Sequence, residues 1–267
     1  MRELSDWTCE FGGLVIGRPG SPVSLVAVDG LLTLPDIRSS DLALVQRHGL
    51  WAGDDYMGGR TVTLTLEVYG RTDDEFARAI TQVQAAFAPA MPEARFRFRF
   101  PGAAGGRTAF INARTRKRSG PLDLNFAYRV CNIIVELFAT DPVIRSEQDR
   151  EVKVTSAAGS AAAPVVRFTQ RGSRVLLPRI TVTNAVRPSL ENVVTGERFA
   201  VDYTGSLVID SAYNRVYSVG GNVDLAAKVS SDSVWPLYGP GTHFVRLTST
   251  DTAKPAVARW SWADEWV

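Results

Sequence analysis

The chain has 267 residues, enough for two domains of about 100 to 150 residues each. Hydrophobic residues make up 45% of it and charged residues 22%, which excludes an intrinsically disordered chain. The net charge of +2, from 30 basic and 28 acidic residues, excludes a general basic field that would recruit nucleic acid or an anionic membrane.

Cysteines and apolar runs exclude further classes of protein. Cys9 and Cys131 are too few for a disulfide framework or a thiolate metal site, so we expect two free thiols in a protein made in a reducing cytosol. No apolar run approaches the roughly 18 residues of a membrane span, and the first residues lack the apolar core of a signal peptide. We expect a soluble chain without membrane insertion.

In chain order, the first clear element is a strand over residues 60–70, because apolar and polar residues alternate in "RTVTLTLEVYG". A helix follows, in which Thr72 and Glu75 have the spacing of a capping box and Pro89 ends the helix. Its apolar stripe consists of Phe76, Ile80, Val83 and Phe87.

The next strand, "ARFRFRF", has two chemically opposite faces. Because side chains alternate along a strand, the arginine face must meet water or an acidic partner. Phe96, Phe98 and Phe100 form one face, and Arg95, Arg97 and Arg99 form the other.

A longer strand is predicted over "LDLNFAYRVCNIIVELFATDP". Its apolar residues are even-numbered up to Val130 and odd-numbered from Cys131 onward, so we expect a β-bulge near residues 130–131. Asp141 and Pro142 end this strand.

Small residues in "SAAGSAAAP" mark a boundary between two domains. We expect a first domain over 1–145, a linker over 146–164 and a second domain over 165–267. The second domain contains short strand candidates without a convincing helix, which predicts an antiparallel sandwich or jelly roll. Trp260 and Trp262 share one face of the last long strand, so the end of the chain is expected to be a core or interface strand.

Catalytic and metal-binding patterns are missing from the sequence. His48 and His243 stand far apart without a zinc or triad pattern around them. Asp54 and Asp55 fit a loop better than a metal site, and Asp210 fits a strand end that bonds local backbone amides. "PGAAGGR" lacks the residues of a phosphate-binding loop and fits a hairpin turn. We therefore assign no catalytic, cofactor-binding or metal residue.

One basic cluster, "RTRKR", spans residues 114–118. A solvated hairpin tip is the favoured interpretation. Contact with an acidic neighbour or with passing nucleic acid remains the alternative.

Several short motifs follow one another in a specific order. In the second half they are "VVTGERFAVDYTGSLVIDSAYNRVYSVGG", "SVWPLYGPGTHFVRL" and "AVARWSWADEW", and in the first half they are "VDG" at 28–30, "HG" at 48–49, "GR" at 59–60 and "ATDP" at 139–142. This order resembles the distal tail proteins of long-tailed (siphovirus) bacteriophages, with His243 where the family usually has Asn. The structural motif residues are Thr195, Gly196, Asp210, Trp235, Leu237, Pro240, Gly241, Trp260, Trp262 and Trp266.

The resemblance implies a mainly β fold: a tail-tube-like sandwich or barrel with one helix, followed by a galectin-like antiparallel β-sandwich. It also implies a structural virion protein without enzymatic activity or cofactor, at the tail tip, assembled in the cytoplasm of the host bacterium. Six copies would form a ring between the tail tube protein and the tail-tip hub proteins, and the tape measure protein and DNA would pass through its lumen. Candidate ring-interface or lumen residues are Arg95, Arg97, Arg99, Arg114, Arg116, Lys117 and Arg118.

Two other functions remain open at this point. A tail-associated carbohydrate-binding module for host adsorption would stack sugars on an exposed aromatic side chain, for which Trp266, Tyr238 and Tyr213 are the candidates. A cell-wall hydrolase would need paired carboxylates or a metal site, and no recognisable spacing supplies one.

Overall fold

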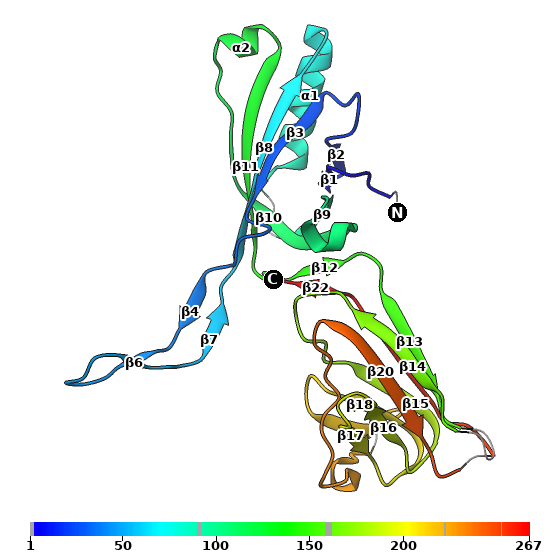
Figure 1. The fold of residues 1–267 in the computed structure, drawn as a ribbon. Helices are drawn as coiled ribbons and strands as arrows, with labels where there is room; N and C mark the ends of the chain where they lie inside the picture. Colours follow the sequence, from blue (N-terminus) through cyan, green and yellow to red (C-terminus); the bar gives the residue numbers. More distant parts are fainter. Residues whose placement is uncertain (1–2, 90–91, 158–161, 222, 252) are drawn as a thin grey trace. The chain divides into compact units, whose positions relative to one another are not determined.

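The computed structural model describes residues 3–89, 92–157, 162–221, 223–251 and 253–267. The chain forms two compact units, residues 1–147 with 266–267 (unit 1) and residues 148–265 (unit 2). Both consist mainly of antiparallel β-sheet, so the predicted mainly β fold is confirmed (Figure 1).

Unit 1 is built on one large antiparallel sheet. Strand β10 changes its partner along its length, pairing through Ala109–Ala113 with β9 and from Arg114 onward with β11. In spatial order the strands are β2 (Leu14–Ile16), β1 (Thr8–Phe11), β9 (Ala94–Arg99), β10 (Ala109–Ser119), β11 (Val130–Ala139), β8 (Arg60–Tyr69) and β3 (Val23–Asp29), with β12 (Ile144–Ser146) on β10.

The predicted helix is present as α1 (Asp73–Ala86). One half of the predicted capping box is present, because the Thr72 hydroxyl accepts from the Glu75 amide at 3.2 Å; the Glu75 carboxylate accepts instead from the amide of Arg71, the residue before the N-cap, at 2.9 Å. Phe76 and Val83 are buried, as the apolar stripe requires.

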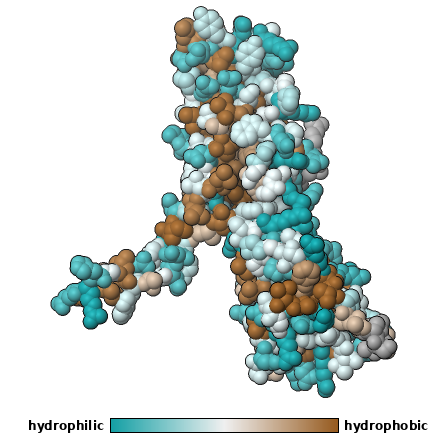
Figure 2. Space-filling view, in the orientation of Figure 1, coloured by the Kyte–Doolittle hydropathy of each residue, from teal (hydrophilic) through white to brown (hydrophobic). Residues whose placement is uncertain are grey.

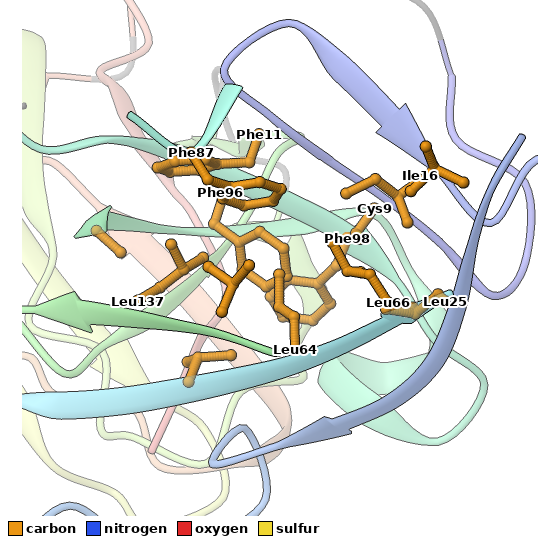
Figure 3. Close-up of a cluster of buried hydrophobic side chains, with 14 of the residues drawn as sticks. Cys9, Phe11, Ile16, Leu25, Leu64, Leu66, Phe87, Phe96, Phe98 and Leu137 are labelled. Atoms are coloured by element: carbon orange, nitrogen blue, oxygen red, sulfur yellow. The ribbon is translucent and has the colours of Figure 1, made fainter. Parts of the chain in front are cut away.

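The core of unit 1 lies between the apolar faces of the strands and α1 (Figure 3). Phe96 and Phe98, which alternate with the arginines of β9, are fully buried, and Phe11 stacks on Phe87 with ring centroids 5.3 Å apart. Alternation in the sequence therefore predicts the buried face of β9 correctly.

The long strand predicted from Leu122 up to Asp141 and Pro142 is wrong in its first part. Residues Leu124–Ala127 form a short helix, α2, because the Asp123 carboxylate accepts from the amides of Asn125 and Phe126, and Arg129 then has a positive φ of 62°. Strand β11 starts at Val130 and pairs with β8 without a register shift. The bulge lies instead in β10, between Thr115 and Lys117.

A hairpin extension, which we call the arm, comprises residues 32–58 between β3 and β8. It is a two-stranded ribbon in which β4 (Ile37–Ser39) pairs with β7 (Asp55–Met57), and β5 (Leu42–Ala43) pairs with β6 (Leu50–Trp51) (Figure 1). The sequence patterns did not predict this element.

Unit 2 is a sandwich of two antiparallel sheets around one core. Phe168 packs edge-on against Trp260 and Trp262 at its centre. One sheet has the order β13 (Arg150–Thr155), β21 (Val257–Trp262), β15 (Arg179–Val186), β18 (Thr204–Asp210) and β19 (Arg215–Ser218); the other has β14 (Val165–Gln170), β20 (Gly241–Thr248), β16 (Ser189–Asn192) and β17 (Arg198–Ala200).

Part of the linker expected over 146–164 is instead the strand β13. Its residues pair with β21 and bury Val152 and Val154, so they belong to the sandwich of unit 2. Residues 158–161 of the expected linker lie outside the described residues.

The final strand, β22 (Glu265–Trp266), pairs with β12 rather than continuing the sheet of unit 2. Trp266 packs against the core of unit 1, whereas Trp260 and Trp262 are buried in unit 2. The tryptophans at the end of the chain are therefore divided between two cores.

Candidate functional site

Two of the three arginines of β9, Arg97 and Arg99, pair with carboxylates inside unit 1. Arg97 is only 5% exposed, and its guanidinium bonds Glu10 and both carboxylate oxygens of Glu147. The hydrogen bonds that Arg97 donates to the Glu147 carboxylate raise the pKa of Arg97. Arg99 pairs with Asp6 at 2.8 Å and with Glu3 at 3.1 Å.

Arg95 has a different environment, because its guanidinium lies 4.4 Å from the centroid of the Phe110 ring. Of the three arginines of β9 that were predicted for a ring interface or lumen, Arg95 is exposed, whereas Arg97 is buried in ion pairs.

The basic cluster at residues 114–118 is not a hairpin tip. It belongs to β10, which remains paired with β11 up to Ser119. Arg116 covers the Phe138 ring at 4.9 Å, and Lys117 pairs with Glu136 at 3.1 Å. Arg118 donates to the carbonyls of Gln84 and Phe87 at the end of α1, the polarity that a helix C-terminus favours.

Arg60 joins three segments that the sequence motifs singled out separately. The side chain is 1% exposed and donates to the carbonyl oxygens of Pro142 (2.9 Å), Gly30 (2.6 Å), Leu31 (3.2 Å) and Thr33 (2.7 Å). The motifs at 28–30, 59–60 and 139–142 therefore meet at one guanidinium. The motif at His48 and Gly49 does not join them, because it lies in the arm.

No carboxylate pairs with Arg60 among the described residues, so burial lowers its pKa. Gly30 must be glycine here: its φ is +88°, and a Cβ atom would lie 2.0 Å from the Thr61 carbonyl oxygen. Three of the accepting carbonyls belong to the segment that enters the arm, so the Arg60 side chain, which follows the arm in sequence, holds the entry and the exit of the arm together.

The arm exposes large apolar side chains that ordinarily lie in a core or an interface. Val45 is 85% exposed and Trp51 is 68% exposed, and Figure 2 shows apolar side chains along the ribbon. The other large exposed apolar residues of the arm are Leu32, Leu34, Ile37, Leu42, Leu50 and Tyr56.

A second apolar surface lies on the outer face of the sheet of unit 1. It is an open hollow of about 640 Å³ that includes Val26 of β3, Thr65 of β8 and Ile134 of β11. Val26 and Ile134 are 53% and 44% exposed, and Figure 2 shows apolar side chains gathered over these strands. We call this surface the outer-face hollow.

Most motif residues of unit 2 stabilise turns and the core. The hydroxyl of Thr195 bonds Glu197 in a turn where Gly196 has a φ of 75°, and the Trp235 ring lies 4.6 Å from that of Phe199. His243 bonds the Gly239 carbonyl at 2.7 Å beside Pro240 and Gly241, while Leu237 is half exposed.

Asp264 is a buried polar residue that the sequence patterns missed. It is 1% exposed, and its Oδ1 accepts from the indole N–H of Trp262 and the amide of Arg171, both at 3.1 Å. No spacing rule predicts this contact, because Arg171 lies 93 residues away in the sequence.

The three aromatic candidates for sugar stacking have very different environments. Tyr238 is 3% exposed, and burial raises the pKa of its hydroxyl; Trp266 packs against the core of unit 1. Tyr213 is 73% exposed and lines an open hollow of about 600 Å³. We call it the β18–β19 hollow.

The described residues form neither a metal-binding cluster nor a membrane-spanning helix. No group of three histidine, cysteine or carboxylate side chains there is placed to hold a metal ion, and Asp54 and Asp55 lie in the arm. No helix in the described ranges has the length and apolar character needed to cross a membrane.

Comparisons with known proteins find similarity in structure. No protein-family model and no curated protein sequence matches the chain. Chains of the phage P2 baseplate in its activated conformation align with TM-scores of 0.35 (with Ca; 7% identity, 91% of each chain) and 0.38 (with Sr; 6% identity, 96% of this chain and 97% of the other).

The Dit protein of phage SPP1 gives a better superposition, with a TM-score of 0.59 and 13% sequence identity. The alignment covers 96% of this chain and 98% of the SPP1 protein, which is described as a paradigm of the hub adsorption apparatus in phages that infect Gram-positive bacteria. Over nearly its whole length, the chain has the fold of SPP1 Dit.

Proposed function

We propose that the chain is a structural protein of a long-tailed bacteriophage that forms a ring of six copies at the tail tip, without catalytic activity. The observation that carries this proposal is the fold shared with SPP1 Dit across both units, over 96% of this chain and 98% of the other. A shared order of two dissimilar β-rich units is harder to reach by chance than either unit alone.

The arm supports self-association. An isolated two-stranded ribbon is marginally stable in water, and this one exposes Leu42 opposite Trp51. Burying these side chains against another copy would stabilise the ribbon. The outer-face hollow offers an apolar surface on the same unit, so arm and hollow are two different surfaces, as a ring of heterologous contacts requires.

The charges of the chain are compatible with a lumen through which DNA passes without being retained. Retention requires several unpaired cations that neutralise phosphates. Here the net charge is only +2, and three of the seven candidate cations, Arg97, Arg99 and Lys117, are paired with a carboxylate of the same unit. We propose that the ring joins the tail tube protein to tail-tip hub proteins and that the tape measure protein and DNA pass through it.

Light scattering and negative-stain microscopy of the purified chain test the ring. Six times the 29.1 kDa chain is about 175 kDa, in a six-fold particle with a central hole. The double variant Leu42→Ser with Trp51→Ser is expected to shift the protein toward monomer. Val194→Ser, at a 71% exposed position in unit 2, is the matched control and is expected to form the same ring as the natural protein.

Two results would overturn the proposal. One is a natural chain that stays monomeric at micromolar concentration, alone and when mixed with the tail tube protein. The other is release of sugar or peptide fragments from host cell walls, with a rate that a substitution in this chain abolishes.

A further inference from the structure

The β18–β19 hollow has a composition that the ring does not explain. It lies at the edge of one sheet of unit 2, where β19 is the last strand. Its polar and aromatic lining consists of Arg179, Asp210, Tyr213, Arg215, Tyr217 and Asp224.

Strand register places three of these charges in one row. Asp210 of β18 lies opposite Arg179 of β15 on one side and opposite Arg215 of β19 on the other. Residues directly opposite each other in neighbouring strands project from the same face of a sheet. The row therefore presents a carboxylate between two guanidinium groups at the surface of the hollow.

The carboxylate and the two guanidinium groups of this row do not pair with one another. Among the described residues, the side chains of Asp210, Tyr213 and Arg215 make no hydrogen bond or ion pair. Arg179 donates to the Tyr217 hydroxyl at 2.8 Å, which holds both side chains at the rim. The hollow thus offers an unpaired acceptor, an unpaired fork of donors and a 73% exposed aromatic ring.

The charges around the hollow favour a neutral ligand over an anion. Two arginines and two carboxylates line the hollow, so their formal charges cancel, and a phosphate or nucleic acid would meet Asp210 and Asp224 as well as the cations. A neutral polyhydroxyl ring fits better. Adjacent hydroxyls donate to a carboxylate and accept from a guanidinium, while the C–H face of the ring packs on Tyr213.

We propose that the β18–β19 hollow binds a neutral saccharide, with Tyr213 as the stacking platform and with Asp210 and Arg215 as hydroxyl partners. A volume of about 600 Å³ lies within the range of small-ligand sites and accommodates one or two sugar rings. The site is complete within one chain, so it is independent of ring formation.

Saturation-transfer NMR and calorimetry on the full chain test the site. The probes are the methyl glycosides of glucose, galactose, rhamnose and N-acetylglucosamine, with glucuronic acid and a glycerol phosphate oligomer as anionic probes. At least one neutral glycoside is expected to bind with one site per chain. Tyr213→Ala and Asp210→Asn are each expected to weaken binding about tenfold, as loss of a stacking face or of a charged hydrogen-bond partner implies.

Tyr128→Ala is the matched control, because Tyr128 is 67% exposed but lies in unit 1. It is expected to bind like the natural chain, as is the arm variant Leu42→Ser with Trp51→Ser, so that failure of the ring and failure of this site are distinguishable. Circular dichroism and thermal unfolding confirm that each variant folds. Three results overturn the proposal: no probe binds, the anionic probes bind more tightly than the neutral ones, or Tyr213→Ala and Asp210→Asn leave binding unchanged.

Discussion

Arg60 donates a hydrogen bond to the carbonyl oxygen of Thr33 at 2.7 Å and thereby ties the first residue of β8 to the root of the arm. The same buried guanidinium donates to the carbonyl of Pro142, which follows β11 and lies 82 residues further along the chain. One side chain thus ties the root of the arm to the segment that follows β11.

Replacing Arg60 by methionine is expected to lower the free energy of unfolding of unit 1 by about 3 kcal/mol, because it leaves buried carbonyl oxygens without donors. Arg60→Lys should lose less, since an ammonium donates but cannot span all four carbonyls. Urea unfolding, monitored by hydrogen exchange of the amides in the sheet of unit 1, measures the loss of stability in both variants. Arg38→Met, on the exposed strand β4, is the control; equal stability of Arg60→Met and this control would contradict the role of Arg60.

Trp266→Ala and Trp260→Ala are expected to destabilise different units, although the two residues are neighbours in sequence. Trp266 is half-buried against the core of unit 1, so its removal should cost that unit about 2 kcal/mol. Removal of the buried Trp260 should cost unit 2 about 4 kcal/mol. Calorimetry with hydrogen exchange assigns each loss to a unit, and loss of protection in unit 2 alone for Trp266→Ala would disprove the assignment.

Both thiols are expected to resist alkylation in the native protein. Burial raises the pKa of Cys9, and burial together with the nearby Asp123 raises the pKa of Cys131, so the reactive thiolate is scarce at neutral pH. Iodoacetamide labelling followed by mass spectrometry should give unmodified cysteines until urea unfolds unit 1. Rapid labelling of folded protein at Cys9 would show that the core opens more readily than its packing implies.

Asp232 is expected to stay ionised in acid. Hydrogen bonds from Arg198 and Ser230 lower its pKa to about 2 from an ordinary value of 3.8. Because the folded-state pKa is lowered, the stabilisation is complete above the unfolded-state value and is lost as the pH falls through about 2. NMR titration of the carboxyl carbon measures this midpoint. In Arg198→Gln the midpoint should return toward 3.8, and an unchanged midpoint would rule out the Arg198 contact as the main cause.

The candidate sites were only partly predictable. Tyr213 and Asp210 were both singled out in the sequence, but as a possible sugar platform and as a strand end in separate contexts. Only the pairing of β18 with β15 and β19 places Asp210 between two arginines beside Tyr213. The arm was missed because its strands are only two or three residues long and are exposed, so they carry no alternating pattern.

The sequence by itself determined the elements whose pattern is local. Period-two alternation identified the buried faces of β8 and β9, and the capping box at Thr72 identified the start of α1. Tertiary structure alone decided that Arg97 meets Glu10 and Glu147, that the bulge lies in β10, and that Trp266 joins the core of unit 1. The reason is physical: a side chain's face follows from its immediate neighbours, whereas its partner depends on register between strands that lie tens of residues apart.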